Sequence, residues 1–434
     1  MTNRTIILGE VCKINSESLS STDNPRYIHY LDTSNITRNR IDGMQLLDRN
    51  KEPFPDRAQR KVKKETIIYS TVRPQQEHYG FLENPINDMI VSTGFATINV
   101  VDEDIDPKYL YYALTRKEIT EYLHTIAVNN VSSYPSIRPD DLAGIVLQIP
   151  TDKIIQEKIA AAISIMDYKI DLNFRITREL EKMAQMLHEY WFLQYDHPDD
   201  MNMPYKTTGG KMKWNEFLKK DIPDEWSTIK LFDLIDNEKT GDWGVESPHG
   251  NHNYKVNCIR GTDINGLEGT EDSTPPERYI LKNKNTNILE PHDLIIEISG
   301  GGPAQSTGRM AYVTDYTLRR FSNPLICSNF CKAISLKNKK LLYNFAYYWN
   351  VLYRNNVLFN YEGKTSGIKN LLYDIFIKSC WLAIPDNKTA DKYYSIMQYI
   401  QEKKQSALLE NRNTSDLKEW LLPMLLNGQA RICN

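Results

Sequence analysis

Histidine and cysteine side chains at two places in the sequence are of the types that ligate metal ions. His249, His252 and Cys258 lie in a stretch rich in glycine, asparagine and proline, where solvated histidines are the ordinary interpretation. Cys327 and Cys331 are close enough for the alternation of one strand to place both on the same apolar face, where cysteine behaves as a small hydrophobic residue. None of the six cysteines forms a CxxC pair. We therefore expect free thiols and no bound metal.

A glycine-rich stretch and a charged triplet are the nearest approaches to phosphate-binding and nuclease motifs. Ser299-Gly300-Gly301-Gly302-Pro303 follows a strand-like run, but no GK[ST] follows it and the proline removes a backbone N–H. Glu402-Lys403-Lys404, considered with Pro385-Asp386, falls inside a predicted helix where a nuclease site needs a strand. The Asn-Pro-Pro-aromatic or Asp-Pro-Pro-aromatic tetrapeptide of an adenine methyltransferase is also missing, and Asn84-Pro85-Ile86 is its nearest approach. We expect a non-catalytic chain without a cofactor of its own.

The charge balance argues against a protein that coats nucleic acid indiscriminately. The formal net charge is −3, whereas such proteins usually carry a marked excess of lysine and arginine. Local basic clusters are nevertheless present, and each fits either a solvated surface or a set of phosphate contacts. Their members are Arg57, Arg60, Lys61, Lys63 and Lys64 in the first cluster, and Lys332, Lys337, Lys339 and Lys340 in the second.

The length of 434 residues predicts about two to four domains, because one hydrophobic core rarely serves so long a chain. Apolar residues at 41% and charged residues at 25% are typical of a soluble globular protein. No window approaches the run of about 18 apolar residues that a membrane span requires. The first residues, Met1-Thr2-Asn3-Arg4 and the short Ile6-Ile7-Leu8 run, lack the features of a signal peptide. We expect a cytoplasmic protein.

The elements that would carry any site are organised as an internal repeat, offset by roughly 225 to 236 residues. The strand-like run 65–70 matches 292–297, and Met89-Ile90-Val91-Ser92 matches Leu325-Ile326-Cys327-Ser328. An aromatic helix follows in each half, with residues 108–114 corresponding to 343–349. The chain therefore contains two copies of one plan.

A long helix is predicted after Ile149-Pro150 and another after Ile384-Pro385. In the first, the apolar positions recur at about 3.6 residues from Ile155 to Trp191. In the second the stripe is weaker, because Lys404, Asn411 and Thr414 stand where apolar residues are expected. These three residues indicate either a water-facing interval or a polar contact that sets the register. Pro423 should kink or stop this helix.

We predict an α+β fold, with tandem α+β domains at residues 1–150 and 222–385 and a linker at residues 196–221. Two long helices, residues 151–195 and 386–434, would join and separate the domains. A helix of about 40 residues spans about 60 Å, and neither apolar stripe can stay exposed to water. We expect the helices to pack as an antiparallel coiled coil that holds the domains apart.

Several stretches resemble the specificity subunits of Type I restriction-modification systems, and the resemblance covers nearly the whole chain. Residues 149–160, 165–173 and 187–192 are similar to the central conserved region of that family. The linker stretch 205–212, the start of the second domain at 222–226 and Trp420-Leu421-Leu422-Pro423 are also similar to family features. The resemblance implies that each α+β domain is a target recognition domain reading one half of a split DNA sequence.

The resemblance also implies partners. The helices would dock two adenine-N6 methyltransferase subunits, and the complex would recruit restriction translocase subunits. S-adenosylmethionine, ATP and Mg²⁺ would then be bound by those partners. The residues expected to contact partner subunits are Ile159, Met166, Ile170, Trp191, Phe192 and Trp420.

The residues expected to contact DNA lie on loops that follow a strand end or a serine-containing turn. Arginine, lysine, asparagine and glutamine there can form paired hydrogen bonds with guanine or adenine edges. In the first domain the set is Arg73, Gln75, Gln76, Ser132, Ser133, Tyr134 and Arg138. In the second domain the set is Gln305, Ser306, Arg309, Lys364, Ser366 and Lys369.

A different class of function is compatible with the acidic net charge. The two α+β domains could serve as a repeated scaffold or adhesion protein that binds protein or glycan. Binding to random duplex DNA distinguishes the two hypotheses, since the scaffold hypothesis predicts none.

Overall fold

The structure, a computed structural model, describes residues 2–20, 22–130, 135–269, 273–300, 302, 305–365, 368–430 and 432. It divides into two compact units, the first formed by Met1–Asp171 with Thr414–Asn434 and the second by Leu172–Asn413. Two long helices, α5 (Lys153–His188) and α11 (Asn387–Leu426), contribute to both units. The domain boundaries expected from the sequence stay a prediction. None of the helices within the described residues combines the length and the apolar composition that a membrane span requires.

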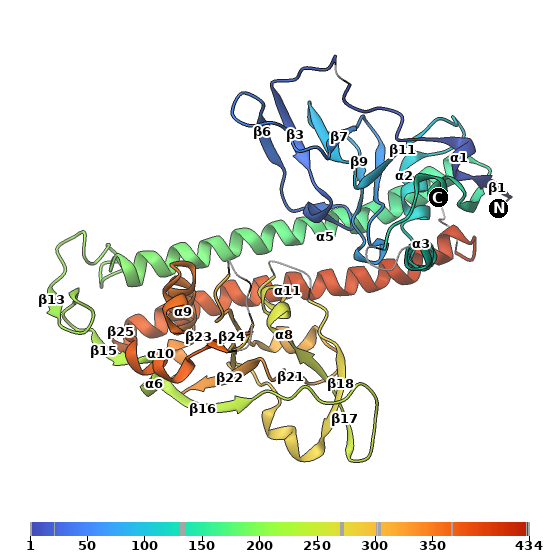
Figure 1. Cartoon of the computed structure of the whole chain (residues 1–434). Helices are drawn as coiled ribbons and strands as arrows, with labels where there is room; N and C mark the ends of the chain where they lie inside the picture. Colours follow the sequence, from blue (N-terminus) through green and yellow to red (C-terminus); the bar gives the residue numbers. More distant parts are fainter. Residues whose placement is uncertain are drawn as a thin grey trace. The chain divides into compact units, whose positions relative to one another are not determined.

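The first unit contains a globular α+β part built on two four-stranded sheets, in the orders β6-β3-β10-β7 and β2-β11-β8-β9, with a separate β1-β12 pair (Figure 1). A short β4-β5 hairpin lies outside these sheets. The strands of the first unit are β1 (Asn3–Ile7), β2 (Cys12–Ile14), β3 (Tyr27–Leu31), β4 (Ile36–Thr37), β5 (Arg40–Ile41), β6 (Gln45–Asp48), β7 (Ala58–Lys61), β8 (Thr66–Ser70), β9 (Tyr79–Leu82), β10 (Met89–Ser92), β11 (Phe95–Val100) and β12 (Val146–Pro150). Its helices besides α5 and α11 are α1 (Leu8–Val11), α2 (Pro107–Leu114), α3 (Lys117–Asn130) and α4 (Pro139–Ala143).

The second unit contains a four-stranded sheet in the order β16-β22-β19-β20 and a three-stranded sheet in the order β18-β17-β21. The pairs β13-β14, β15-β25 and β23-β24 complete it. Its strands are β13 (Met212–Asn215), β14 (Lys220–Pro223), β15 (Ser227–Lys230), β16 (Ile235–Thr240), β17 (His252–Ile259), β18 (Glu277–Leu281), β19 (Leu294–Glu297), β20 (Met310–Tyr312), β21 (Leu325–Cys327), β22 (Cys331–Leu336), β23 (Glu362–Thr365), β24 (Ile368–Leu371) and β25 (Trp381–Ile384). Its helices besides α5 and α11 are α6 (Leu231–Leu234), α7 (Ile264–Leu267), α8 (Asp315–Arg319), α9 (Leu342–Arg354) and α10 (Tyr373–Ser379).

Strand order confirms the internal repeat. The order β2-β11-β8-β9 in the first unit has the same pattern as β16-β22-β19-β20 in the second. In each unit one strand pair of the other sheet is parallel, β3 with β10 and β17 with β21, whereas the neighbouring pairs are antiparallel. The matching strands β8 and β19 are buried along their whole length, which explains why both read as uninterrupted apolar runs.

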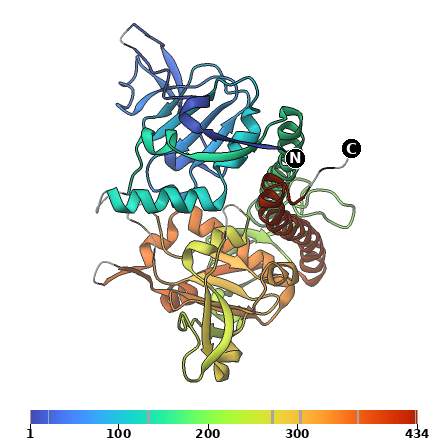
Figure 2. The same cartoon turned by 90° about the vertical axis from the view of Figure 1, so that its right-hand side faces the viewer.

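The two long helices run antiparallel where they meet within each unit (Figure 1), and Figure 2 views them nearly end-on. In the first unit Lys418 of α11 pairs with Asp167 of α5, and in the second unit Lys404 of α11 pairs with Glu181 of α5 at 2.8 Å. Residue numbers therefore rise along α5 as they fall along α11. The fold class expected from the sequence, two α+β parts with a pair of long antiparallel helices, is confirmed.

The polar residues in the second helical stripe face inward rather than toward water. Lys404 is fully buried and Asn411 is 5% exposed. On the facing helix Asn173, 2% exposed, donates its side-chain N–H to Glu410 at 2.9 Å and to the Ala407 carbonyl at 3.4 Å. Of the two alternatives, these contacts favour the polar contacts that set the register. Pro423 does not stop the helix, because α11 continues through it to Leu426, and the other alternative, a kink at Pro423, stays a prediction.

Cys327 and Cys331 lie on two strands, not on one face of a single strand. Cys327 ends β21 and Cys331 begins β22, with a turn between them. Both thiols are buried in one apolar cluster, and burial raises the pKa of Cys327 to about 12. They are free cysteines. No group of three or more metal-ligating side chains occurs within the described ranges.

Candidate nucleic-acid interface

In the first unit the loop after β8 forms a tight turn that presents two glutamines. Its 3-10 turn, Pro74–Gln76, is flanked by Arg73 and Glu77, both in the left-handed region with φ of 48° and 57°. Pro74 is buried, which anchors the turn, while Gln75 and Gln76 are exposed. The local sequence therefore fixes the backbone and leaves two amide side chains facing solvent.

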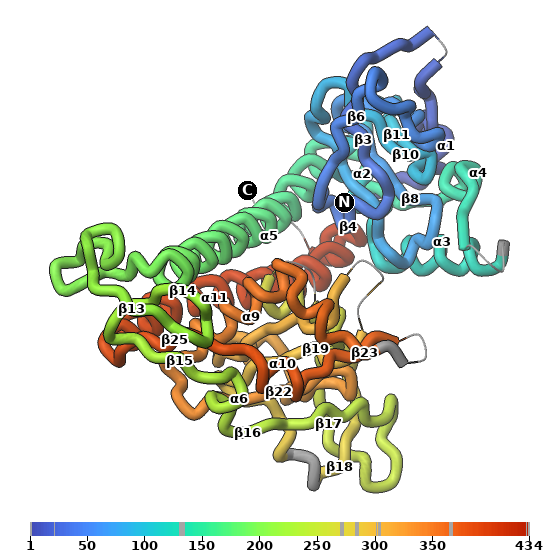
Figure 3. The backbone as a smooth tube through the Cα atoms, turned by 60° about the vertical axis from the view of Figure 1, so that its left-hand side comes forward, coloured from blue at the N-terminus to red at the C-terminus, as the bar shows by residue number. Residues whose placement is uncertain are grey.

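This turn lies against the segment that enters α4. The Arg73 N–H donates to the Pro135 carbonyl at 2.9 Å, and the Ile137 N–H donates to the Thr71 carbonyl at 2.8 Å. Arg138, exposed at the start of α4, follows directly. Ser132, Ser133 and Tyr134 lie outside the described residues. The loop after β8 therefore lies beside residues 135–137, which lead into α4 (Figure 3).

The second unit repeats this arrangement after β19. Ser299 pairs with Asn370, and the Gly300 N–H donates to the Lys369 carbonyl at 3.0 Å. The loop after β19 therefore lies along β24, as the loop after β8 lies along residues 135–137. Gln305 is exposed, and its carbonyl accepts a hydrogen bond from the Lys369 ammonium at 3.3 Å. Lys369 also pairs with Glu362 at 3.1 Å.

Two of the second-domain candidates support the loop instead of projecting from it. Ser306 is 3% exposed, and its hydroxyl donates to the Thr307 carbonyl. Arg309 makes two hydrogen bonds to the buried carboxylate of Glu297, at 2.6 and 3.0 Å. Ser306 and Arg309 therefore stabilise the loop in this structure, and their expected contacts with DNA stay a prediction. Ser366 and the side chain of Lys364 lie outside what the structure describes.

A neighbouring hairpin adds basic residues that the sequence analysis missed. Arg38 and Asn39, both with positive φ, form the tight turn between β4 and β5. The Arg38 N–H donates to the Glu77 carbonyl at 2.9 Å, and the two side chains form an ion pair. The hairpin therefore lies beside the Gln75-Gln76 turn. A Thr-Arg-Asn-Arg sequence between two short β-branched runs was the available signal.

The basic clusters are largely neutralised by neighbours in the first unit. Lys61 pairs with Asp23 at 2.8 Å, and Lys63 and Lys64 approach Glu17 and Glu65 at 3.7 and 3.8 Å. Exposed pairs of this kind contribute about 0 to 1 kcal/mol, so a phosphate can replace the carboxylate at small cost.

The cluster in the second unit is similar. Lys332 pairs with Glu238 at 2.7 Å and Lys340 with Asp391 at 3.3 Å. Both interpretations of these clusters stay open.

Comparison with known proteins covers the first of these loops. Residues 3–182 match the family model described as the Type I restriction modification DNA specificity domain. The matched residues include the whole Gln75-Gln76 turn and most of α5.

Relatives extend the similarity beyond the specificity domain. The Type I restriction enzyme HindI specificity subunit of Haemophilus influenzae is 31% identical over 189 residues, which are 44% of this chain and 40% of that subunit. The match thus spans less than half of that relative's length. The Type I restriction enzyme MjaIX specificity subunit of Methanocaldococcus jannaschii is 22% identical over 373 residues, 85% of this chain and 78% of that subunit.

A solved structure shares the fold over both units. The S subunit of a Type I restriction-modification system from M. genitalium covers 98% of this chain and 96% of its own, with 14% identity and a TM-score of 0.53. This likeness shows the fold alone.

Three of the six residues expected to dock partner subunits are buried within the chain. Ile159 lies in the core of the first unit at 3% exposure, and Trp191 and Phe192 lie in the core of the second unit at 3% and 4%. Their side chains already pack against their own chain, and their contact with partner subunits stays a prediction. Met166 and Ile170 are partly buried, and Trp420 is 60% exposed. The apolar residues that α5 exposes instead are Ile154, Ile165, Tyr168, Ile176, Met183 and Met186.

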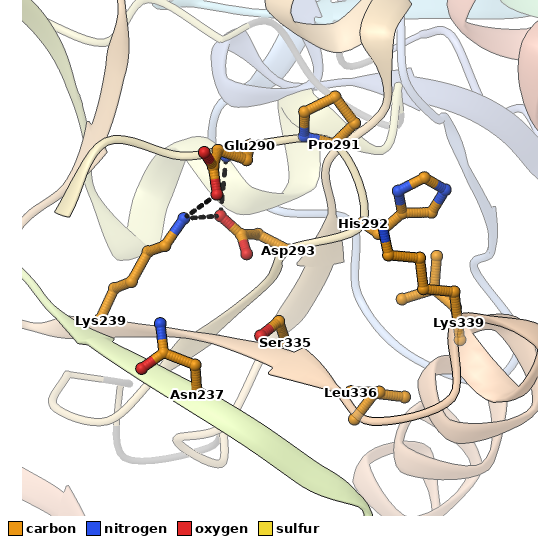
Figure 4. A pocket seen from close by; sticks show the side chains of 10 residues that line it. Asn237, Lys239, Glu290, Pro291, His292, Asp293, Ser335, Leu336 and Lys339 are labelled. Carbon is orange, nitrogen blue, oxygen red and sulfur yellow. Dashed lines mark hydrogen bonds and ion pairs between the residues drawn. The ribbon is translucent and has the colours of Figure 1, made fainter. Parts of the chain in front are cut away.

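A polar pocket in the second unit is lined in part by residues 290–293, which precede β19, whereas the Gln305 loop follows that strand. Figure 4 shows the side chains that line the pocket. The pocket encloses about 170 Å³. The Lys239 ammonium points at Asp293 and Glu290, at 2.8 and 3.0 Å. Burial alone would lower the pKa of Lys239, but the two carboxylates outweigh burial and raise it. The charges of Lys239, Glu290 and Asp293 are therefore satisfied by one another.

Proposed function

We propose that the chain is the DNA-sequence-specificity subunit of a Type I restriction-modification complex, and that each unit reads one half of a split target. The observation that carries the proposal is the repeated loop. In the first unit the loop after β8 lies against residues 135–137, and in the second unit the loop after β19 lies against β24. Each loop presents exposed glutamine, Gln75 and Gln76 in the first unit and Gln305 in the second.

The chemistry of these loops suits base reading in the major groove. A glutamine amide can donate to and accept from an adenine edge at once, and an arginine can donate twice to guanine. Gln75 and Gln76 stand on a turn of fixed backbone, with Arg138 on the adjoining segment. In the second unit Gln305 and Lys369 take the corresponding place. Two different loop sets favour a target with two unlike halves.

The proposal includes partners and leaves catalysis to them. Two methyltransferase subunits would dock on the long helices and use S-adenosylmethionine, and restriction translocase subunits would use ATP and Mg²⁺. This chain would supply no catalytic residue, and the complex would act in the cytoplasm, where its DNA target lies. The exposed apolar residues of α5 and Trp420 are the docking candidates whose side chains are accessible in this structure.

Coexpression with the methyltransferase encoded beside it tests the proposal. We expect the chain to co-purify with two methyltransferase copies and to direct adenine methylation to a two-part motif, detected by sequencing modified bases in the host genome. The methyltransferase alone is the control. A chain that binds no methyltransferase and no duplex DNA at low salt contradicts the proposal and favours the scaffold function.

Replacing Arg73, Gln75 and Gln76 with alanine should relax recognition of one half-site only. We expect a loss of about 1 to 3 kcal/mol for each base contact that is removed, because each lost pair of hydrogen bonds leaves the base edge unread. Methylation mapping reports both halves at once, so the unaffected half is the internal control. Equal relaxation of both halves would show that the two units do not read DNA separately.

A further inference from the structure

Two equivalent tyrosines of the repeat make the same kind of contact in the two units. Tyr112 of α2 and Tyr347 of α9 occupy matching positions of the aligned aromatic helices 108–114 and 343–349. The Tyr112 hydroxyl donates to Asp167 at 2.7 Å, and the Tyr347 hydroxyl donates to Glu181 at 3.0 Å. Both carboxylates belong to α5. Each recognition unit is therefore hydrogen-bonded to this helix through its own aromatic helix.

A lysine from α11 completes each contact. The Lys418 ammonium pairs with the same Asp167 carboxylate, and the Lys404 ammonium donates to Glu181 at 2.8 Å. Each cluster of tyrosine, carboxylate and lysine thus joins three elements: the aromatic helix, α5 and α11. We call Tyr112–Asp167–Lys418 the first clamp and Tyr347–Glu181–Lys404 the second clamp.

The clamps sit in surroundings that make each hydrogen bond directional. Tyr112 and Tyr347 are 3% and 1% exposed, and burial raises the pKa of both phenols well above the ordinary value. Each hydroxyl therefore stays protonated and donates a hydrogen bond to the carboxylate. A hydrogen bond to a charged group is stronger than a neutral one and has a preferred angle, so it restrains how the aromatic helix lies on α5.

The clamps are not a simple product of duplication. A copied first unit would place the second carboxylate on α11, the helix that follows the second unit as α5 follows the first. In the second unit α11 instead supplies Gln401, which donates to the Tyr347 hydroxyl at 2.8 Å, and the carboxylate comes from α5 again. The same three chemical groups therefore meet in both units although the helices have exchanged places.

We infer that the two clamps are positioning devices that fix the angle at which each recognition unit is held on the helix pair, and thereby set the gap between the two half-sites. The inference rests on the proposed function. The clamps touch no base, so they act through the placement of the loops that do. Loosening a clamp should change which gaps are accepted while the bases read in each half stay the same.

The variants Tyr112→Phe and Tyr347→Phe remove only the hydroxyl. Matched controls are Tyr109→Phe in α2 and Tyr393→Phe in α11, whose buried hydroxyls have no hydrogen-bond partner among the described residues. Each variant is coexpressed with the methyltransferase, and methylated sites are mapped and sorted by gap length. A second variant of the first clamp, Asp167→Asn with Lys418→Met, removes both charges together where the side chains are 27% and 24% exposed.

We expect methylation at gaps one base pair from the preferred length to rise about tenfold in the clamp variants, because a lost hydrogen bond to a carboxylate is worth roughly one power of ten in a conformational equilibrium. The controls should keep the wild-type ratio, and the melting temperatures of clamp and control variants should agree within a few degrees.

Two failures can be told apart. If the wild-type complex shows no two-part motif, the proposed function itself is wrong. If the wild type shows the motif with one gap, but both tyrosine variants and the charge-free double variant keep the gap ratio of the controls, the clamps are only structural and the inference is overturned. A lower melting temperature with an unchanged gap ratio overturns it in the same way.

Discussion

Replacing Lys404 with methionine should lower the free energy of unfolding of the second unit by about 3 to 5 kcal/mol, the usual cost of removing one partner from a buried ion pair. The Lys404 side chain is fully buried, and its ammonium donates to Glu181 and Glu268 at 2.8 Å each and to the Tyr312 hydroxyl at 3.0 Å. Methionine keeps most of the volume but leaves two carboxylates without their cation.

The two carboxylates are not equivalent. Burial alone would raise the pKa of Glu181, but the Lys404 ammonium outweighs burial and lowers it, whereas burial raises the pKa of Glu268 despite the same ammonium. Glu181 is therefore the principal counter-charge of Lys404. Adding Glu181→Gln to Lys404→Met should recover more stability than adding Glu268→Gln, because it removes the charge that the lysine neutralises.

Urea unfolding followed by tryptophan fluorescence suits this test. Six of the seven tryptophans lie in Leu172–Asn413, namely Trp191, Trp214, Trp226, Trp243, Trp349 and Trp381. The matched control is Lys403→Met, next to Lys404 but exposed, which should change stability by less than about 0.5 kcal/mol. A Lys404→Met variant as stable as that control would mean that Lys404 is not buried and paired.

The fold class could be predicted from the internal repeat and from the apolar stripes of the two long helices. Strands β8 and β19 are buried throughout, so each appears as a continuous apolar run that can be aligned with the other half. The short hairpin strands are different. β4, β5 and β23 each pair with a neighbour in a local hairpin, but they are short and largely polar, so no hydrophobic period marks them in the sequence.

The places of the candidate loops in the chain were predicted more accurately than the exposure of the individual side chains on them. The loops after β8 and β19 follow from the strand ends, and both exist. Whether a side chain on such a loop projects or folds back depends on partners that the sequence does not show. Arg309 turns toward Glu297 on the neighbouring strand, and Ser306 is covered, while Gln75 and Gln305 stay exposed.

The expected docking residues show the same dependence. An apolar stripe on a helix indicates that something covers it, not whether the cover is the same chain or a partner. Ile159 is covered by the first unit itself, and Trp191 and Phe192 lie within a π-helical turn, Glu189–Leu193, and pack in the core of the second unit. Trp420, which continues the stripe of α11, is the one that stays mostly exposed.

Lengthening both long helices by seven residues should widen the gap between the half-sites and keep both half-site sequences. Seven residues add about 10 Å of helix and turn the helix face by only about 20°, so the buried face stays in phase. The insertions belong after Arg175 in α5 and after Leu409 in α11. These positions leave Asn173 with Glu410 on one side and Glu181 with Lys404 on the other.

Insertion into α5 alone is the matched control. If Glu181 keeps its contact with Lys404, the insertion moves Asp167 two turns away from Lys418. If Asp167 keeps Lys418, the insertion separates Glu181 from Lys404. One of the two ion pairs must therefore be lost. We expect the single insertion to lower the melting temperature and the yield of methyltransferase complex, and the paired insertion to restore both. Comparing the single insertion with the paired insertion therefore tests whether the two helices keep their pairing.

Methylation mapping of the paired variant gives the decisive measurement. One duplex turn of about 34 to 36 Å holds about 10 base pairs, so 10 Å of added helix corresponds to at most about three base pairs, and we expect a gap one to three base pairs longer. The half-site bases should not change, because the loops after β8 and β19 lie outside the lengthened segments. A stable paired variant with the wild-type gap would show that the helices do not measure the distance between half-sites. Altered bases within a half-site would show that base reading is not confined to the two loop sets.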